Sequence, residues 1–187
     1  LGSRPRPLPQ GLAADVLFDG RLAAAGATRI AERVPNRRAG TTGDALVADQ
    51  VEAGLEASGF QVERQPFTHA GRRLENVIAR RAGRSRRQIV IVAGRDAQTV
   101  PEATGSASDT AALLELGRVF QGRPSRKTLV LASVDGSSLG EVGVAELVRS
   151  AVEFLRGVDV VVEPRKQWAR GASGPRALQR EPPACYL

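Results

Sequence analysis

The chain has 187 residues, of which 42% are apolar and 25% charged, and this balance predicts one globular domain. No apolar run is long enough to span a membrane, and the single cysteine excludes both an internal disulfide and a zinc cluster built on cysteines. The net charge of +7 comes almost entirely from arginine, but only 4% of the residues are aromatic, which is too few for a base-stacking surface. We therefore expect no nucleic-acid partner.

The first third of the chain predicts a lead-in and two helices. Residues 1–18 are rich in proline and predict an extended lead-in. Asp19 is a suitable cap for a helix that Pro35 would end. A second helix, capped by Thr42 or Asp44, should extend to about Ser58, because its apolar residues recur every four positions.

Two strands and a basic turn follow. Phe60–Phe67 alternates apolar and polar residues, as a half-exposed strand does, and Pro66 places that strand at a sheet edge. Leu74–Arg80 predicts a second strand. The basic segment Arg80–Arg87 is interpreted as the tip of a hairpin, which explains its charge without a nucleic-acid patch.

The most informative stretch is a strand, a helix and a second strand in the middle of the chain. Gln88–Gly94 and Lys127–Val134 are short apolar runs, and they flank an amphipathic helix at Ser106–Phe120. This pattern predicts two parallel strands buried on both faces. Ligands of such sheets bind beyond the carboxyl ends of the strands, so we expect the loops that start at Gly94 and Asp135 to build any site.

The last part of the chain changes character. A helix over Glu141–Leu155 and a strand over Val158–Val162 complete the domain, which we place at residues 19–163. Residues 164–187 form an irregular basic tail, which indicates either disorder or a shifted reading frame. The chain contains no Met, so Leu1 is not a natural start, and a signal or anchor segment that precedes it would be invisible here.

Several segments together resemble a known family. They occur in the order Asn76–Ala79, Ile89–Asp96, Thr104–Leu116 and Leu129–Gly136. This order and spacing resemble the zinc aminopeptidase family that includes aminopeptidase Y and the bacterial leucyl aminopeptidases, over about residues 19–150. The resemblance implies an α/β fold of the zinc-exopeptidase (phosphorylase/hydrolase-like) type, with a mixed, mostly parallel sheet between helices, here truncated at its C-terminus. It also implies two zinc ions and a location outside the cytoplasm, tethered by a segment that this chain lacks.

The residues that would carry the family's chemistry are mostly replaced. Gly94 occupies the position of a histidine ligand, and Gly105 that of the aspartate that bridges the two zinc ions. Ser137 and Ser138 occupy the positions of a glutamate pair, the general base followed by a ligand, whereas Asp96 is kept. Because a catalytic zinc needs three protein ligands, we expect no bound zinc or other cofactor and no peptidase activity.

Three alternatives follow from these replacements. The former cleft could bind a peptide or protein through Arg95, Asp96, Gly105, Ser137 and Ser138, with Arg95 available for a carboxylate. Gly136–Gly140 also fits the nucleophile elbow of serine hydrolases. In that class the catalytic histidine follows the serine in the sequence, but the one histidine of this chain, His69, precedes it. Finally, the chain could be a non-functional remnant with an unpaired sheet edge.

Overall fold

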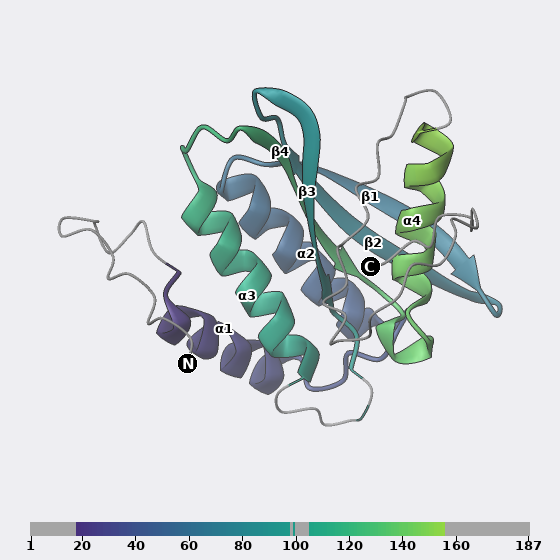
Figure 1. The fold of residues 1–187 in the computed structure, drawn as a ribbon. Coiled ribbons are helices and arrows are strands. Elements are labelled where there is room, and N and C mark those ends of the chain that lie inside the picture. Colours follow the sequence, from purple (N-terminus) through teal and green to yellow (C-terminus); the bar gives the residue numbers. More distant parts are fainter. Residues whose placement is uncertain (1–17, 98, 100–104, 156–187) are drawn as a thin grey trace, which may run out of the picture.

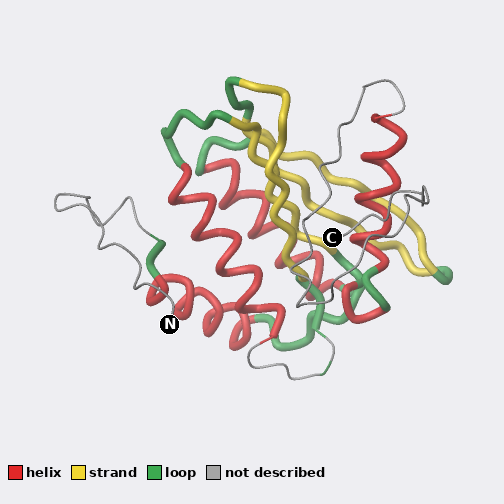
Figure 2. The backbone as a smooth tube through the Cα atoms, in the orientation of Figure 1, coloured by secondary structure: helices red, strands yellow, loops and turns green. Residues whose placement is uncertain are grey.

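The computed structural model describes residues 18–97, 99 and 105–155, and Figures 1 and 2 trace its elements through the chain. In chain order these are α1 Gly20–Arg33, α2 Thr42–Ala57, β1 Gln61–His69, β2 Arg72–Arg81, β3 Ser85–Gly94, α3 Gly105–Phe120, β4 Lys127–Val134, the short 3-10 helix η2 Ser137–Leu139 and α4 Val142–Leu155. The predicted strand Val158–Val162 and the tail from Pro164 lie outside the described residues, as does nearly all of the predicted lead-in.

The first two helices begin where local capping chemistry places them. The Asp19 carboxylate accepts hydrogen bonds from the backbone N–H groups of Arg21 and Leu22, at 2.8 and 3.3 Å, which confirms it as the cap of α1. The cap of α2 is Thr41, whose hydroxyl accepts from the Asp44 N–H at 3.4 Å. The expected caps, Thr42 and Asp44, lie inside the first turn, which leaves the Asp44 carboxylate free for a longer-range contact.

The sheet is mixed, as predicted, with strand order β1-β2-β4-β3, but antiparallel pairs outnumber the parallel pair among the described strands, so it is not mostly parallel as expected. β1 pairs antiparallel with β2, β2 pairs antiparallel with β4, and β3 pairs parallel with β4. Pro66 therefore lies on an edge strand, where its missing N–H costs no ladder hydrogen bond. The parallel β3–β4 pair joined by α3 is the predicted central unit.

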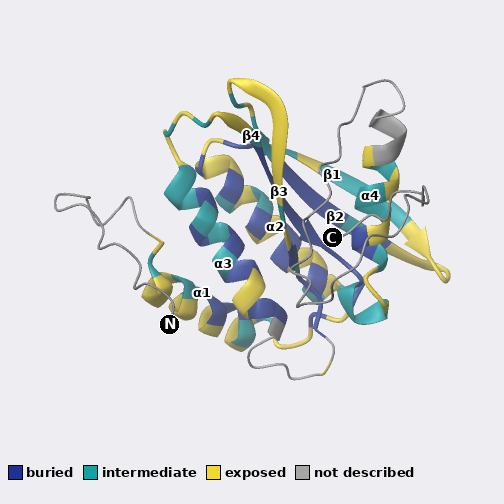
Figure 3. Ribbon diagram, viewed as in Figure 1, coloured by how far each residue is buried: buried dark blue, intermediate teal, exposed yellow. Residues whose placement is uncertain are grey.

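Two further expectations about this sheet are wrong. β2 and β3 do not form a hairpin, because β4 lies between them, so the basic turn at residues 82–84 passes the start of β4 instead. β3 is also not buried on both faces: it is an edge strand among the described elements, and Ile89, Val90 and Val92 are exposed (Figure 3). Only β4 has the nearly continuous burial that was expected of both strands.

The helices form layers on the two faces of the sheet (Figure 1). Because side chains alternate along a strand, Leu129 and Leu131 of β4 pack into the main core with α1, α2 and α3. Ala132 and Val134 point to the opposite face and contact α4 through Val144. Among the described helices, none has the length and apolar character that crossing a membrane requires.

Candidate functional site

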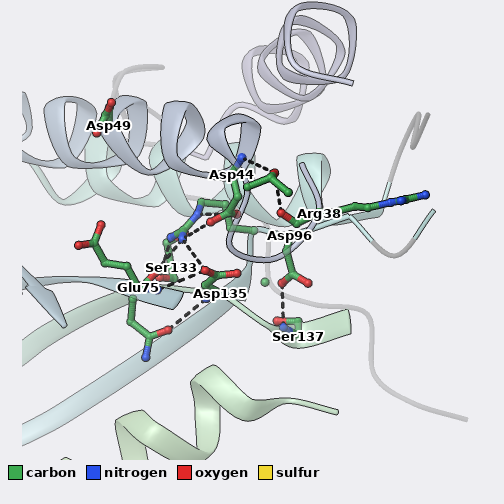
Figure 4. Close-up of polar contacts among 12 residues, drawn as sticks. Arg38, Asp44, Asp49, Glu75, Asp96, Ser133, Asp135 and Ser137 are labelled. Atoms are coloured by element: carbon green, nitrogen blue, oxygen red, sulfur yellow. Dashed lines mark hydrogen bonds and ion pairs between the residues drawn. The ribbon is translucent and has the colours of Figure 1, made fainter. Parts of the chain in front are cut away.

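The predicted site loops meet at the carboxyl ends of β3 and β4, as the parallel arrangement requires. Asp96 follows β3 by two residues and Asp135 follows β4 directly, while Asp44 comes from the first turn of α2 and Glu75 from β2. Figure 4 shows these four carboxylate residues around the two strand ends. Asp44, Asp96 and Asp135 are buried, so the charges of this site belong to the interior of the fold.

Arg95 is the centre of this charged cluster. Its side chain has no exposed surface, and its Nε and Nη2 atoms donate to the two oxygens of Asp44 at 2.9 and 2.7 Å. The same guanidinium donates to the backbone carbonyls of Glu75, at 2.7 Å, and Ser133, at 3.3 Å. Arg95 thus ties α2, β2 and β4 together from within, and a carboxylate arriving from outside would have to displace Asp44.

Asp96, the one carboxylate kept from the family pattern, is held by the second loop. Its oxygens accept hydrogen bonds from the backbone N–H groups of Ser137, at 2.7 Å, and Ser138, at 2.9 Å. Figure 4 shows the Asp96 carboxylate directed at Ser137. The carboxylate therefore closes the β3 loop onto the β4 loop through backbone hydrogen bonds.

Gly94 and Ser137, which stand where the family has its histidine ligand and its general base, lie next to each other. Gly94 lacks a side chain, and a Cβ added there would lie 2.8 Å from the Ser137 hydroxyl oxygen. That oxygen is buried and has no hydrogen-bond partner in the part of the chain that the structure describes. Gly105, at the bridging position, begins α3. The space between Gly94 and Ser137 is thus closed by two small residues.

These residues do not fit a zinc site of the expected kind. In the described part of the chain, no group of three or more His, Cys, Asp or Glu side chains is placed to hold a metal ion. Both Asp96 oxygens already accept backbone hydrogen bonds, and Arg95 places a positive charge 3.9 Å from an oxygen of Asp135. Serine and glycine supply no replacement for the imidazole and carboxylate ligands that zinc prefers.

The geometry also lends no support to a serine nucleophile. Neither hydroxyl of Ser137 and Ser138 donates a hydrogen bond to a histidine or carboxylate among the described residues. His69 ends β1 and is solvent-exposed. A hydroxyl without an adjacent base is a weak nucleophile at neutral pH.

Asp135 is the least satisfied group of the cluster. Its Oδ2 accepts from the Glu75 N–H at 3.2 Å and its own N–H donates to the Asn76 side chain at 3.1 Å, but its Oδ1 is buried and has no hydrogen-bond partner among the described residues. Burial and the nearby Asp44 charge raise the pKa of Asp135 to about 7, against the opposing effect of Arg95. Burial also raises the pKa of Asp44, although the charge of Arg95 counteracts it.

A small pocket lies beside Asp135. It has a volume of about 160 Å³ and is lined by residues of the α2 start, β1, β2 and the two strand ends, among them Thr41, Glu75, Arg95 and Asp135. The Glu75 carboxylate at its rim accepts from Arg64 at 2.7 Å. The lining thus offers an exposed cation, Arg73, and a buried carboxylate, Asp135, whose Oδ1 has no hydrogen-bond partner among the described residues.

The raised pKa of Asp135 predicts a pH-dependent stability. Because the folded state binds this proton more tightly than the unfolded chain, stability should fall as the pH rises from about 4 to about 7, by up to roughly 4 kcal/mol. Asp135→Asn should flatten this dependence and make the protein more stable than the parent at pH 8, as measured by urea unfolding across the pH range. Asp49→Asn, at an exposed surface position, should leave the profile unchanged, and an unchanged profile in Asp135→Asn would contradict the assignment.

The sequence identified the loops but missed part of the cluster. Asp44 was interpreted as a helix cap, and Asp135 only as the start of a loop. The position of Asp135 directly after a buried strand is the signal that could have marked it. No local pattern indicates that Arg95 would reach Asp44, because 51 residues separate the two.

Comparisons with solved structures place the fold. A zinc aminopeptidase from Bacillus subtilis aligns with a TM-score of 0.66 and 11% identity, over 72% of this chain and 65% of that one. The fold is that of zinc aminopeptidases. A glutaminyl cyclase from Porphyromonas gingivalis (TM-score 0.57, 23% identity) covers 65% of this chain and 46% of its own, so the same fold also serves a second activity.

A leucine aminopeptidase precursor from Bacteroides thetaiotaomicron agrees, with a TM-score of 0.54 and 20% identity over 64% of this chain and 47% of that one. The chain therefore spans about half to two thirds of the length of these structures. No family model and no curated protein matches the sequence. At these identities the agreement shows the aminopeptidase-like fold, and the chemistry has to be argued from the residues of the site.

Proposed function

We propose that this protein is a non-catalytic member of the aminopeptidase Y and leucyl aminopeptidase type that binds a peptide or protein at the old active-site end of the sheet. The observation that supports the absence of catalysis is that Asp96 binds the backbone of the neighbouring loop. Its two oxygens accept from the backbone of the Ser137 loop, at 2.7 and 2.9 Å, so the chain's own hydrogen bonds join the loops. The location outside the cytoplasm that the resemblance implies stays a prediction.

The ligand group is argued from the pocket beside Asp135. Arg95 is saturated by Asp44 and backbone carbonyls, which disfavours Arg95 as the receptor of a peptide carboxylate. The buried Oδ1 of Asp135 lacks a donor, and a free amino group would supply both a donor and a compensating charge. A pocket of about 160 Å³ admits such a group at a peptide terminus.

Titration with the tripeptide Leu-Gly-Gly and its N-acetyl form, followed by backbone NMR shifts, tests this proposal. The free amine should bind at least about tenfold more tightly than the acetylated peptide, which corresponds to roughly 1.4 kcal/mol. Asp135→Asn should abolish that difference, whereas Asp49→Asn should retain it. Equal binding of the two peptides, or shifts confined to surfaces away from Thr41 and Asp135, would refute recognition at this pocket.

A further inference from the structure

A second charged surface lies at the opposite end of the sheet, where β3 and β4 begin. Five basic residues gather there, and each is exposed: Arg84, Arg86, Arg87, Arg126 and Lys127. We call this group the basic end. Four of the five, together with Ser85, line a hollow of about 620 Å³. The exposed start of β3 is visible at this end of the molecule in Figure 3.

The charge of the basic end is uncompensated. Residues 76–94 and 116–134, which supply it, contain nine basic residues and no Asp or Glu. No ion pair joins any of its five side chains to a described acidic residue, whereas Arg64, Arg80, Arg118 and Arg149 all have carboxylate partners. Like charges brought together without partners repel one another, so binding of an anionic ligand would reduce this repulsion.

Backbone hydrogen bonds join the two segments that carry these cations. The Arg84 N–H donates to the Ser125 carbonyl and the Ser85 N–H to the Arg126 carbonyl, both at 3.0 Å. The Ser85 hydroxyl also donates to the Arg126 carbonyl, at 2.9 Å. The cations therefore project from two segments of backbone that are hydrogen-bonded to each other.

Apolar side chains continue from the basic end along β3. Val90 is 50% and Val92 37% exposed on one face of β3, whereas Ile89, 42% exposed, points to the opposite face. Exposed aliphatic residues beside arginines suit a membrane interface, where the cations meet lipid phosphates and the apolar groups meet the acyl boundary. Single-stranded nucleic acid would instead favour aromatic residues for stacking, and the lining of the hollow contains none.

We propose that the basic end docks the protein on an anionic membrane surface, with its arginines on the phosphates of the lipid headgroups. β3 separates this end from the candidate site by its ten residues, or roughly 30 Å. This inference is independent of the proposed peptide binding, since it uses different residues at the other end of the sheet.

Co-sedimentation with phosphatidylcholine vesicles, with and without roughly one third phosphatidylglycerol, tests the proposal. Binding should require the anionic lipid and weaken at high salt. The triple variant Arg84→Glu, Arg87→Glu, Arg126→Glu should reduce partitioning by about 100-fold or more. A matched triple of exposed residues elsewhere (Arg21→Glu, Arg29→Glu, Arg72→Glu) has the same net charge and should retain most of the binding.

Three outcomes would overturn the inference. One is equal loss in the two triple variants, which would show that net charge alone attracts the protein. Another is tighter binding to a single-stranded oligonucleotide than to the vesicles, lost in the basic-end variant. The third is saturable binding of pyrophosphate at this end without vesicle binding, which would assign the hollow to a soluble phosphate. Circular dichroism of each variant separates these results from misfolding. A second basic-end triple variant, with glutamine in place of glutamate at the same three positions, serves the same purpose.

Discussion

Replacing Arg95 with methionine is expected to lower the free energy of unfolding by about 3–5 kcal/mol, because it leaves buried carboxylates without their cation. Asp44 would lose two hydrogen bonds of 2.9 and 2.7 Å, and Asp135 would lose the nearest positive charge. The carbonyls of Glu75 and Ser133 would also lose a donor. Urea unfolding, followed by circular dichroism, measures the difference.

Two further variants separate the burial of the charge from its mere removal. Arg80→Met breaks an exposed pair with Glu63 and should cost less than about 1 kcal/mol. The double variant Arg95→Met, Asp44→Leu removes both buried charges and should recover part of the loss, since a buried pair replaced by apolar side chains is often close to neutral. A cost for Arg95→Met no larger than that for Arg80→Met would show that the pair does not organise the site.

Replacing Asp96 with alanine should have the second-largest destabilising effect. The backbone N–H groups of Ser137 and Ser138 would lose a charged acceptor, at a cost of about 2–4 kcal/mol for the two bonds. Amide hydrogen exchange at Ser137 and Ser138 should accelerate with it, because these bonds hold the loop.

The exchange measurement separates this local role from a general loss of stability. Asp96→Asn keeps one acceptor oxygen and should give an intermediate rate at the two amides. Asp49→Ala removes an exposed carboxylate and should leave them unchanged. Unaltered exchange at Ser137 and Ser138 in Asp96→Ala would mean that the loop is held by something other than this carboxylate.

Much of the fold follows from local sequence. Asp19 and the apolar spacing of the first helices, the alternation ending at Phe67 and the two apolar runs of the central unit each encode their element directly. The insertion of β4 between β2 and β3 could not be read in this way, because strand neighbours are chosen by long-range pairing. The run of arginines at residues 80–87 favoured a hairpin tip, although the segment in fact crosses to the edge of the sheet.

The candidate site likewise has a part that local sequence predicts and a part that depends on long-range packing. Asp96 and Asp135 were placed near a site by a topological rule that depends only on strand direction. The fate of Arg95 depends on packing: side chains of neighbouring residues point in opposite directions along an extended chain, so Arg95 reaches Asp44 while Asp96 reaches Ser137. An exposed arginine and a buried one are indistinguishable until the surrounding helices are in place.

The Asp96 carboxylate joins the strand-end loops beside the buried Arg95–Asp44 pair, and we expect no catalytic zinc to be held there. The most direct test is the zinc content of protein purified in the presence of zinc, measured by mass spectrometry together with hydrolysis of leucine p-nitroanilide. The expected result is zinc far below stoichiometric and no turnover above the blank. Stoichiometric zinc, with turnover that a chelator abolishes, would contradict the account.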